Sequence, residues 1–288
     1  MNELKQELLF QDFFPKAGSP SSEKESLETA EKFFELANAP VVSYQIDSKS
    51  KSLIKIHQNS NCQTHTGGIV WETAYLLAEF LLLRYTDKYS MGKLLEVGSG
   101  CGLLGLVLAA HNRCKKVVMT ETTEVLESLK ENVELNTITK NGWCTQNMVS
   151  VQRLRWDKFE KDIDKCKSMG HTDLDPQSFD TVIGTDVIFS TVLVKPLLKT
   201  LRRMTHDNSN IFLCVQIRCT DSHELFMRKA SKYFKIKDCT DELESIPTLK
   251  WGLEMECKIL HITIINKSNK KRKKSSNKDG VKQKKHKI

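Results

Sequence analysis

A glycine-rich turn is the first place in the sequence where the residue types indicate chemistry. The run Leu94-Leu-Glu-Val-Gly-Ser-Gly-Cys-Gly-Leu-Leu-Gly passes from a short apolar stretch through glycines into a helical pattern. Glycines permit a tight turn and let a ligand approach the backbone, and the N–H groups that open a helix favour a negative group. Gly98, Ser99 and Gly100 are therefore predicted to contact a ligand.

An acidic residue follows the next apolar stretch. Val117-Val-Met-Thr ends at Glu121, and a carboxylate at the tip of a strand can accept hydrogen bonds from both hydroxyls of a ribose. Open α/β sheets bind their ligands at the carboxyl ends of the strands. The turn and Glu121 together predict a ligand that contains a nucleoside.

Two nucleoside ligands fit this pattern. Gly100-Cys-Gly-Leu-Leu-Gly105 matches the dinucleotide pattern G-x-G-x-x-G, with an acid about 20 residues further on. Glu96, however, ends the preceding strand, and its carboxylate would repel a pyrophosphate but attract an amino group and a sulfonium. We therefore favour S-adenosylmethionine over NAD and predict that Glu96 contacts it. A glycine-rich turn that binds no ligand is the structural alternative.

These residues need a sheet to position them, and the pattern from Lys93 onward supplies one. Short apolar strands are expected at 94–97, 117–120, 149–154, 181–184 and 211–215, with helices at 103–111, 124–135, 193–204 and 221–234. Such alternation is typical of a parallel sheet with helices on both faces. Two further strands, 234–237 and 258–265, follow without a convincing helix between them. We predict a Rossmann-like, doubly wound, mostly parallel seven-stranded sheet with one antiparallel strand near the C-terminus.

The remaining segments divide the chain. We expect a flexible lead over residues 1–23, an N-terminal helix and β-hairpin over 24–65, and a catalytic domain over 66–266 that binds S-adenosylmethionine. Within this domain, residues 70–85 are predicted to form an amphipathic helix, and the charged region 158–177 is predicted to be a surface insertion. Residues 267–288 are expected to be a disordered basic tail.

The charge of the chain is concentrated in that tail. Residues 267–288 carry eleven Lys or Arg and one Asp, or +10, so the other 266 residues carry −2 of the total of +8. A basic folded surface that grips nucleic acid is therefore disfavoured, although the tail could be an RNA-binding arm with weak contact, a nuclear address or a solubilising end. The nine cysteines form no C-x-x-C pair, so neither a disulfide framework nor a metal site is expected. We also expect no membrane segment, and a cytoplasmic or nuclear location.

Four motifs resemble a known family. Glu96-Val-Gly-Ser-Gly-Cys-Gly resembles the first motif of class I methyltransferases. Val70-Trp-Glu-Thr-Ala, Leu154-Arg-Trp156 and Asp186-Val-Ile-Phe189 resemble the methyltransferase-like 21 group of seven-strand protein-lysine methyltransferases, and the resemblance covers about residues 64–265. It implies S-adenosylmethionine as the cofactor and a protein lysine as the target. The group includes enzymes that act on translation elongation factors and on chaperone-type ATPases.

The resemblance also implies roles for single residues. Trp71 and the Gly98-Ser99-Gly100 turn would contact the cofactor, Glu121 would hold the ribose, Trp156 would pack beside the adenine, and Thr185 would lie at the wall of the pocket. A flat apolar partner suits an adenine ring, although either tryptophan could instead serve packing.

Asp186 and Phe189 are the catalytic candidates. Asp186 is expected at the carboxyl end of a strand, where it would attract and aim the lysine ammonium, although it could instead cap the next helix. Phe189 stands where the family usually has Tyr, which keeps the aromatic wall but removes a hydroxyl. The alternatives to a protein-lysine methyltransferase are an RNA or small-molecule methyltransferase and a non-catalytic binding protein with the same fold. The oligomeric state does not follow from the sequence.

Overall fold

A computed structural model describes most of the chain. It covers residues 7–14, 23–46, 52–59, 66–137 and 148–265. The predictions for residues 1–6 and 15–22 of the lead and for the basic tail at 267–288 lie outside the described residues.

A seven-stranded sheet forms the centre of the molecule. Its strands lie in the order β6-β5-β4-β7-β8-β10-β9, and β10 is antiparallel to both of its neighbours while the other pairs are parallel. This confirms the predicted sheet with one reversed strand. The bounds are β4 Lys93–Val97, β5 Lys116–Glu121, β6 Val149–Arg153, β7 Phe179–Thr185, β8 Thr205–Gln216, β9 Phe234–Asp238 and β10 Cys257–Ile264.

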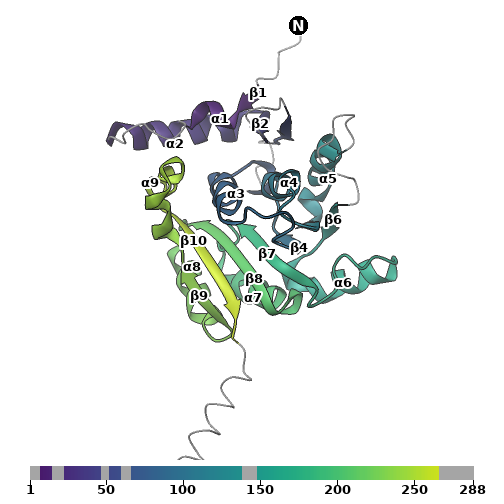
Figure 1. Ribbon diagram of the computed structural model, residues 1–288. Coiled ribbons are helices and arrows are strands. Elements are labelled where there is room, and N and C mark those ends of the chain that lie inside the picture. The colour runs from purple at the N-terminus through teal and green to yellow at the C-terminus, as the bar shows by residue number, and fades with distance from the viewer. Residues whose placement is uncertain (1–6, 15–22, 47–51, 60–65, 138–147, 266–288) are drawn as a thin grey trace, which may run out of the picture.

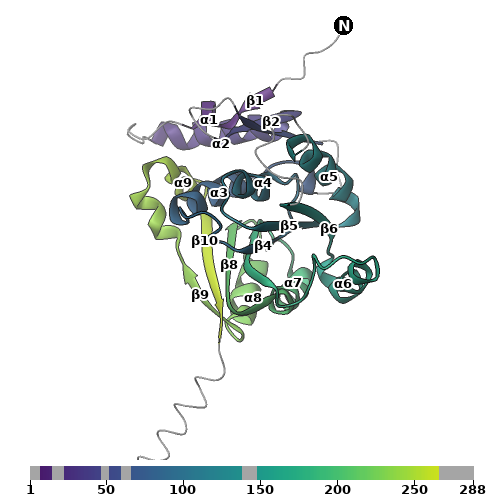
Figure 2. The ribbon, with the colours of Figure 1, turned by 45° about the vertical axis from the view of Figure 1, so that its right-hand side comes forward.

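Helices cover both faces of this sheet (Figures 1 and 2). One face carries α3 (Glu72–Arg84), α4 (Leu103–Ala110) and α5 (Thr123–Thr137), and the other carries α6 (Phe159–Ser168), α7 (Thr191–Met204) and α8 (Thr220–Ala230). A hydrophobic core lies on each face of the sheet, and successive strand residues point into opposite cores. Leu94 and Val117 belong to the first core, and Leu95 and Val118 belong to the second. β5 lies on one side of β4, and β7 lies on the other. The strand order therefore reverses between β4 and β7, and the topological switch point lies at the carboxyl ends of these two strands.

The region 158–177, predicted to be a surface insertion from its charge and lack of periodicity, has regular structure. It contains α6, preceded by a short 3-10 turn at Trp156–Lys158. Ile163 and Cys166 are buried against the second core, and Asp162 pairs with Arg153 at the end of β6. Two apolar residues spaced three apart are too few to give a recognisable period, so the tertiary contacts decide the helix.

An additional layer covers the first face of the molecule. It contains β1 (Glu7–Leu9), α1 (Phe10–Phe13), α2 (Glu23–Asn38), β2 (Val41–Gln45) and β3 (Leu53–His57). The predicted helix and hairpin are present, but the flexible lead is wrong for residues 7–14, because β1 pairs in parallel with β2. Phe10 is 3% exposed and stacks on Tyr75 of α3 at 4.1 Å between ring centroids.

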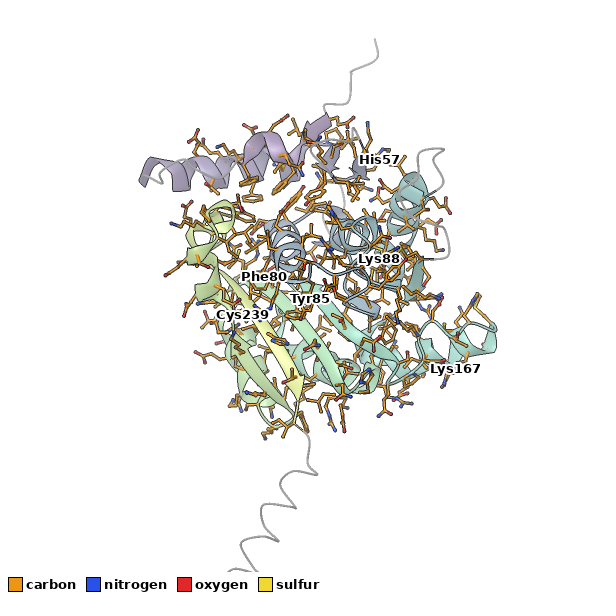
Figure 3. The ribbon with its side chains drawn as sticks, viewed as in Figure 1. His57, Phe80, Tyr85, Lys88, Lys167 and Cys239 are labelled. Carbon is orange, nitrogen blue, oxygen red and sulfur yellow. The ribbon has the colours of Figure 1, made fainter. Side chains whose placement is uncertain are left out.

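This layer also explains why α3 is not amphipathic. Side chains fill the space between the layer and the sheet (Figure 3), and nine residues of α3 are buried, from Glu72 to Leu81. Phe33 of α2 packs on Trp251 of the short helix α9 (Trp251–Glu254), which follows the 3-10 turns η3 (Thr240–Ser245) and η4 (Pro247–Leu249). In the described part of the chain, no helix is both long and apolar enough to cross a membrane.

Candidate active site

The glycine turn after β4 is held by backbone hydrogen bonds to β5. Gly98 and Gly100 have φ angles of +66° and +52°, which favour glycine. Ser99 donates its N–H to the Thr120 carbonyl at 2.9 Å, and its hydroxyl oxygen accepts the Thr120 N–H at 3.0 Å. The main chain of the turn is thereby fixed before any ligand arrives.

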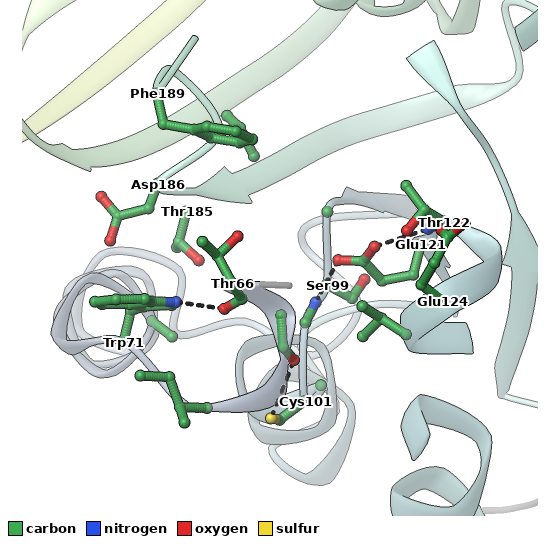
Figure 4. A pocket seen from close by; sticks show the side chains of 18 of the residues that line it. Thr66, Trp71, Ser99, Cys101, Glu121, Thr122, Glu124, Thr185, Asp186 and Phe189 are labelled. Carbon is green, nitrogen blue, oxygen red and sulfur yellow. Dashed lines mark hydrogen bonds between the residues drawn. The ribbon is translucent and has the colours of Figure 1, made fainter. Parts of the chain in front are cut away.

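The carboxylate of Glu121 is fixed by the same turn (Figure 4). Its Oε1 accepts the N–H of Gly100 at 2.9 Å, and its Oε2 accepts the N–H of Thr122 at 2.7 Å. An ionised carboxylate has about four acceptor positions, so these two bonds do not exhaust its capacity for hydroxyl groups. The arrangement suits a ribose diol at the tip of β5.

Trp156 forms an apolar wall opposite the turn. A Cβ atom on Gly98 would lie 3.3 Å from the Trp156 ring and 3.2 Å from Val187. Leu154 and Leu193 line the same cavity beside them. A flat aromatic ring with aliphatic neighbours is an environment that an adenine can enter.

Asp186 lies beyond the end of β7 in a strained conformation. Its φ is +50°, in the left-handed region that few residues other than glycine adopt. Its Oδ1 accepts the N–H of Gln216 at 2.9 Å, and its Oδ2 accepts the hydroxyl hydrogen of Thr73 at 2.9 Å. Burial raises the pKa of the Asp186 carboxyl, while the hydrogen bond from Gln216 and the charge of Arg218 oppose that rise.

Arg218 links Asp186 to two residues at the start of α3. Its guanidinium donates to Glu72, lies 3.7 Å from Asp186 Oδ2, and has its carbon 4.5 Å from the Trp71 ring centroid. The indole N–H of Trp71 is donated to the Thr66 carbonyl at 2.8 Å. No motif in the sequence singles out Glu72, Thr73 or Arg218 as a site residue. Arg218 could have been found because it closely follows β8, at the same edge of the sheet as Asp186.

One cavity joins these groups. Its volume is about 470 Å³, within the range of small-molecule sites. Four carboxylates and two guanidinium groups line it, a formal charge of −2, which disfavours a pyrophosphate. The lining acids are Glu121, Glu124, Asp157 and Asp186, and the bases are Arg155 and Arg218.

Nine of the ten predicted site residues line this cavity: Trp71, Gly98, Ser99, Gly100, Glu121, Trp156, Thr185, Asp186 and Phe189. In the view of Figure 4, Asp186 lies between the rings of Trp71 and Phe189. Phe189 is 46% exposed, so its ring borders the solvent side of the cavity.

Glu96 is the exception, and its predicted contact with the ligand does not match the structure. Only 2% of the residue is exposed, and a Cβ on Gly105 would lie 2.6 Å from its Oε2. The carboxyl therefore points beneath the turn toward α4 and not into the cavity. Burial raises its pKa to about 8. An acid at a strand end does not reveal which face it occupies, and this one faces the core.

The fold and the cavity together define a doubly wound α/β protein with a cavity at its topological switch point. Residues 48–233 match the lysine methyltransferase family, and the chain belongs to this family.

Two of three similar proteins are named as lysine methyltransferases. A protein of Dictyostelium discoideum with no assigned role is 27% identical over 222 residues, which cover 72% of this chain and 60% of that protein. Protein N-lysine methyltransferase METTL21A of Danio rerio is 27% identical, covering 59% of this chain and 69% of its own. EEF1A lysine methyltransferase 3 of Mus musculus is 25% identical, with 61% and 67% covered. The chain thus spans between 60% and 69% of the length of these three relatives.

Proposed function

We propose that this protein transfers a methyl group from S-adenosylmethionine to the side-chain nitrogen of a lysine in a protein substrate. The observation that carries the proposal is one cavity that contains both the Glu121 carboxylate at the tip of β5 and the Asp186 carboxylate beyond β7. Membership of the lysine methyltransferase family supports the type of transfer.

The residues of the cavity fit this cofactor. The backbone-bound Glu121 would hold the ribose hydroxyls, Trp156 would pack on the adenine, and the turn at Gly98 and Gly100 would lie along the methionine part. The negative lining suits a ligand with a sulfonium and an amino group. When bound, the cofactor supplies an electrophilic methyl group whose S–CH₃ bond breaks with its electron pair left on sulfur.

The protein has to bring a neutral amine in line with that methyl group. Lysine has an ordinary pKa near about 10.4, so at neutral pH it arrives as an ammonium that Asp186 attracts and orients. Desolvation beside the apolar ring of Phe189 lowers the pKa of the amine, while the Asp186 carboxylate opposes that shift. One proton leaves to water before the N–CH₃ bond forms. Asp186 acts by position, because well-oriented reactants account for much of the rate gain in a transfer of this kind.

The names of the relatives suggest a class of protein substrate. EEF1A lysine methyltransferase 3 carries an elongation factor in its name, and we propose a translation elongation factor as the first substrate to test. A chaperone-type protein is the second. The basic tail would favour RNA as the methyl acceptor. The cavity in the described part of the chain carries a negative formal charge, which disfavours the phosphates of RNA.

The test is a lysate experiment. The full chain is incubated with cell lysate and S-adenosylmethionine labelled in the methyl group, and the product is treated with nuclease or with protease. We expect label that survives nuclease, is released by protease and appears as methyllysine after hydrolysis. Label removed by nuclease would reject the protein substrate. Calorimetry with S-adenosylmethionine separates a non-catalytic binder, which would bind the cofactor without transferring label to any fraction.

A further inference from the structure

A positively charged side chain lies between two acids at the end of the cavity away from Glu121. The Arg218 guanidinium donates to Glu72, lies 3.7 Å from Asp186 Oδ2 and stacks on Trp71. The side chains of Glu72 and Asp186 are only 8% and 14% exposed. An aromatic face with two carboxylates is the environment in which proteins hold an ammonium or guanidinium cation.

We infer that Trp71, Glu72 and Asp186 form the binding site for the substrate's ammonium group, and that Arg218 occupies this site in the free protein. We name the three residues the cation seat. The inference rests on the proposed function, because Trp71 and Asp186 line the same cavity and Glu72 lies beside it as a partner of Arg218. It gives Glu72 a role as a second carboxylate, and it gives the ring of Trp71 a contact with the substrate beside the expected contact with the cofactor.

A cation stabilises the two carboxylates of the seat. Burial raises the pKa of both carboxyls, while the charge of Arg218 lowers it. Removing one partner from a buried ion pair leaves the other charge uncompensated. Exchange of Arg218 for a lysine ammonium keeps the seat neutralised, whereas a lysine that entered beside Arg218 would meet a like charge.

Arg218 is the member of the cluster that can move. Its side chain is 42% exposed, and it lies between the end of β8 and the start of α8. The acids are better fixed: Asp186 is hydrogen-bonded to Gln216 and Thr73, and Glu72 lies in the first turn of α3. The guanidinium borders the solvent, but its departure alone would leave two buried acids without a countercharge, so we expect it to leave the seat as the ammonium enters.

Because the natural lysine is unidentified, the test uses n-butylammonium chloride, a small primary ammonium. Its binding to the full chain is followed by thermal unfolding, against sodium chloride at equal ionic strength. If Arg218 fills the seat more than about nine-tenths of the time, Arg218→Ala should bind the probe about 10-fold more tightly than wild type. Arg218→Met, which keeps an unbranched aliphatic stem and removes the charge, should show the same gain if the alanine variant does not fold.

Two further variants make the result specific to the seat. Adding Glu72→Gln to either Arg218 variant should cancel the gain. Arg155→Ala removes another arginine of the same cavity, one whose carboxylate partner is Asp162, and it should respond as wild type does. An Arg218 variant that binds no more tightly than wild type, or a gain that persists with Glu72→Gln, overturns the inference.

The same variants separate this inference from the proposed function. Label transfer into lysate protein is measured in parallel. If the Arg218 variants bind n-butylammonium as expected but neither they nor wild type transfer label, the proposed function fails while the seat stands. If wild type transfers label but the Arg218 variants show no tighter binding, the seat fails while the function stands.

Discussion

The two ends of the cavity are built in different ways. At the Glu121 end, backbone groups from one continuous segment hold the carboxylate: the turn at Gly98–Gly100 and the N–H of Thr122. At the Asp186 end, side chains from segments far apart in sequence meet: Thr73 and Asp186 are 113 residues apart, and Glu72 and Arg218 are 146 apart. The first end is specified by local geometry and the second by tertiary packing.

This difference agrees with the roles that we propose. A cofactor is constant, and a backbone cradle binds a constant group without depending on many side chains. A protein substrate varies, and side chains at the sheet edge can change without disturbing the turn. Substitutions should therefore separate cofactor binding from transfer, and the predictions below test that separation from the largest effect to the smallest.

The strongest expected effect is that of Asp186→Asn. Asparagine tolerates the left-handed conformation that Asp186 adopts, so the backbone should keep its course while the charge is lost. We expect kcat/KM for labelled transfer to fall by at least about 10²-fold, the scale of a lost orientation, while the Kd for S-adenosylmethionine by calorimetry stays within about 3-fold.

The matched control is Asp157→Asn, which removes an exposed acid that lines the same cavity. It should change transfer far less than Asp186→Asn does. A weakening of cofactor binding by Asp186→Asn as large as the loss of transfer would mean that the two ends of the cavity are not separable.

Glu121→Ala should act at the other end. The variant loses charged hydrogen bonds to the ribose, each worth about 1.5–3 kcal/mol, so we expect the Kd for S-adenosylmethionine to rise by about 10- to 10²-fold. Calorimetry measures this directly. Glu124→Ala, three residues on and exposed at the same cavity, is the control and should stay close to wild type. Comparable losses in both variants would point to net charge and not to a ribose contact.

The sequence predicts the first end of the cavity better than the second for a physical reason. A strand, glycines and a helix in immediate succession define the turn, and the next strand places Glu121 beside it, so short-range patterns suffice. The seven-stranded sheet follows from the same periodicity, including the reversed β10.

The sequence does not reveal which segments meet across the sheet. Thr73 and Glu72 reach Asp186 and Arg218 only because α3 crosses the end of β7, and no spacing in the chain encodes that contact. The same limit applies to residues 7–14, where a few apolar side chains gain their order from Tyr44 and Tyr75. Glu96 shows a further limit: the sequence predicts its position near the strand end, but the face that it occupies depends on the packing of α4.

Glu96 gives a prediction about stability. The unfolded carboxyl has a pKa near 4.5 and the folded one a pKa of about 8. Between these values the folded protein retains a proton that the unfolded chain has released, so stability falls as the pH rises, by about 1.4 kcal/mol per pH unit. Glu96→Gln removes this contribution and should gain stability relative to wild type from pH 5 to pH 8.

The measurement is urea unfolding of both proteins at several pH values. Taking the difference between variant and wild type isolates Glu96 from Glu72 and Asp186, whose carboxyls also have raised pKa values. A difference that does not vary with pH would show that Glu96 is ionised in the folded protein.

The smallest expected effect is that of Phe189→Tyr, which adds the hydroxyl that the resembling family usually has at this position. Because Phe189 is 46% exposed at the border of the cavity, the new hydroxyl can reach water in the free protein and should not reduce stability. In the complex it can accept or donate one neutral hydrogen bond near the substrate nitrogen, worth about 0.5–1.5 kcal/mol. We therefore expect kcat to rise by between about 2- and 10-fold with the cofactor Kd unchanged. Phe189→Leu, which removes the ring, should lower kcat, and an equal response to Tyr and Leu would show that neither ring nor hydroxyl guides the substrate at this end of the cavity.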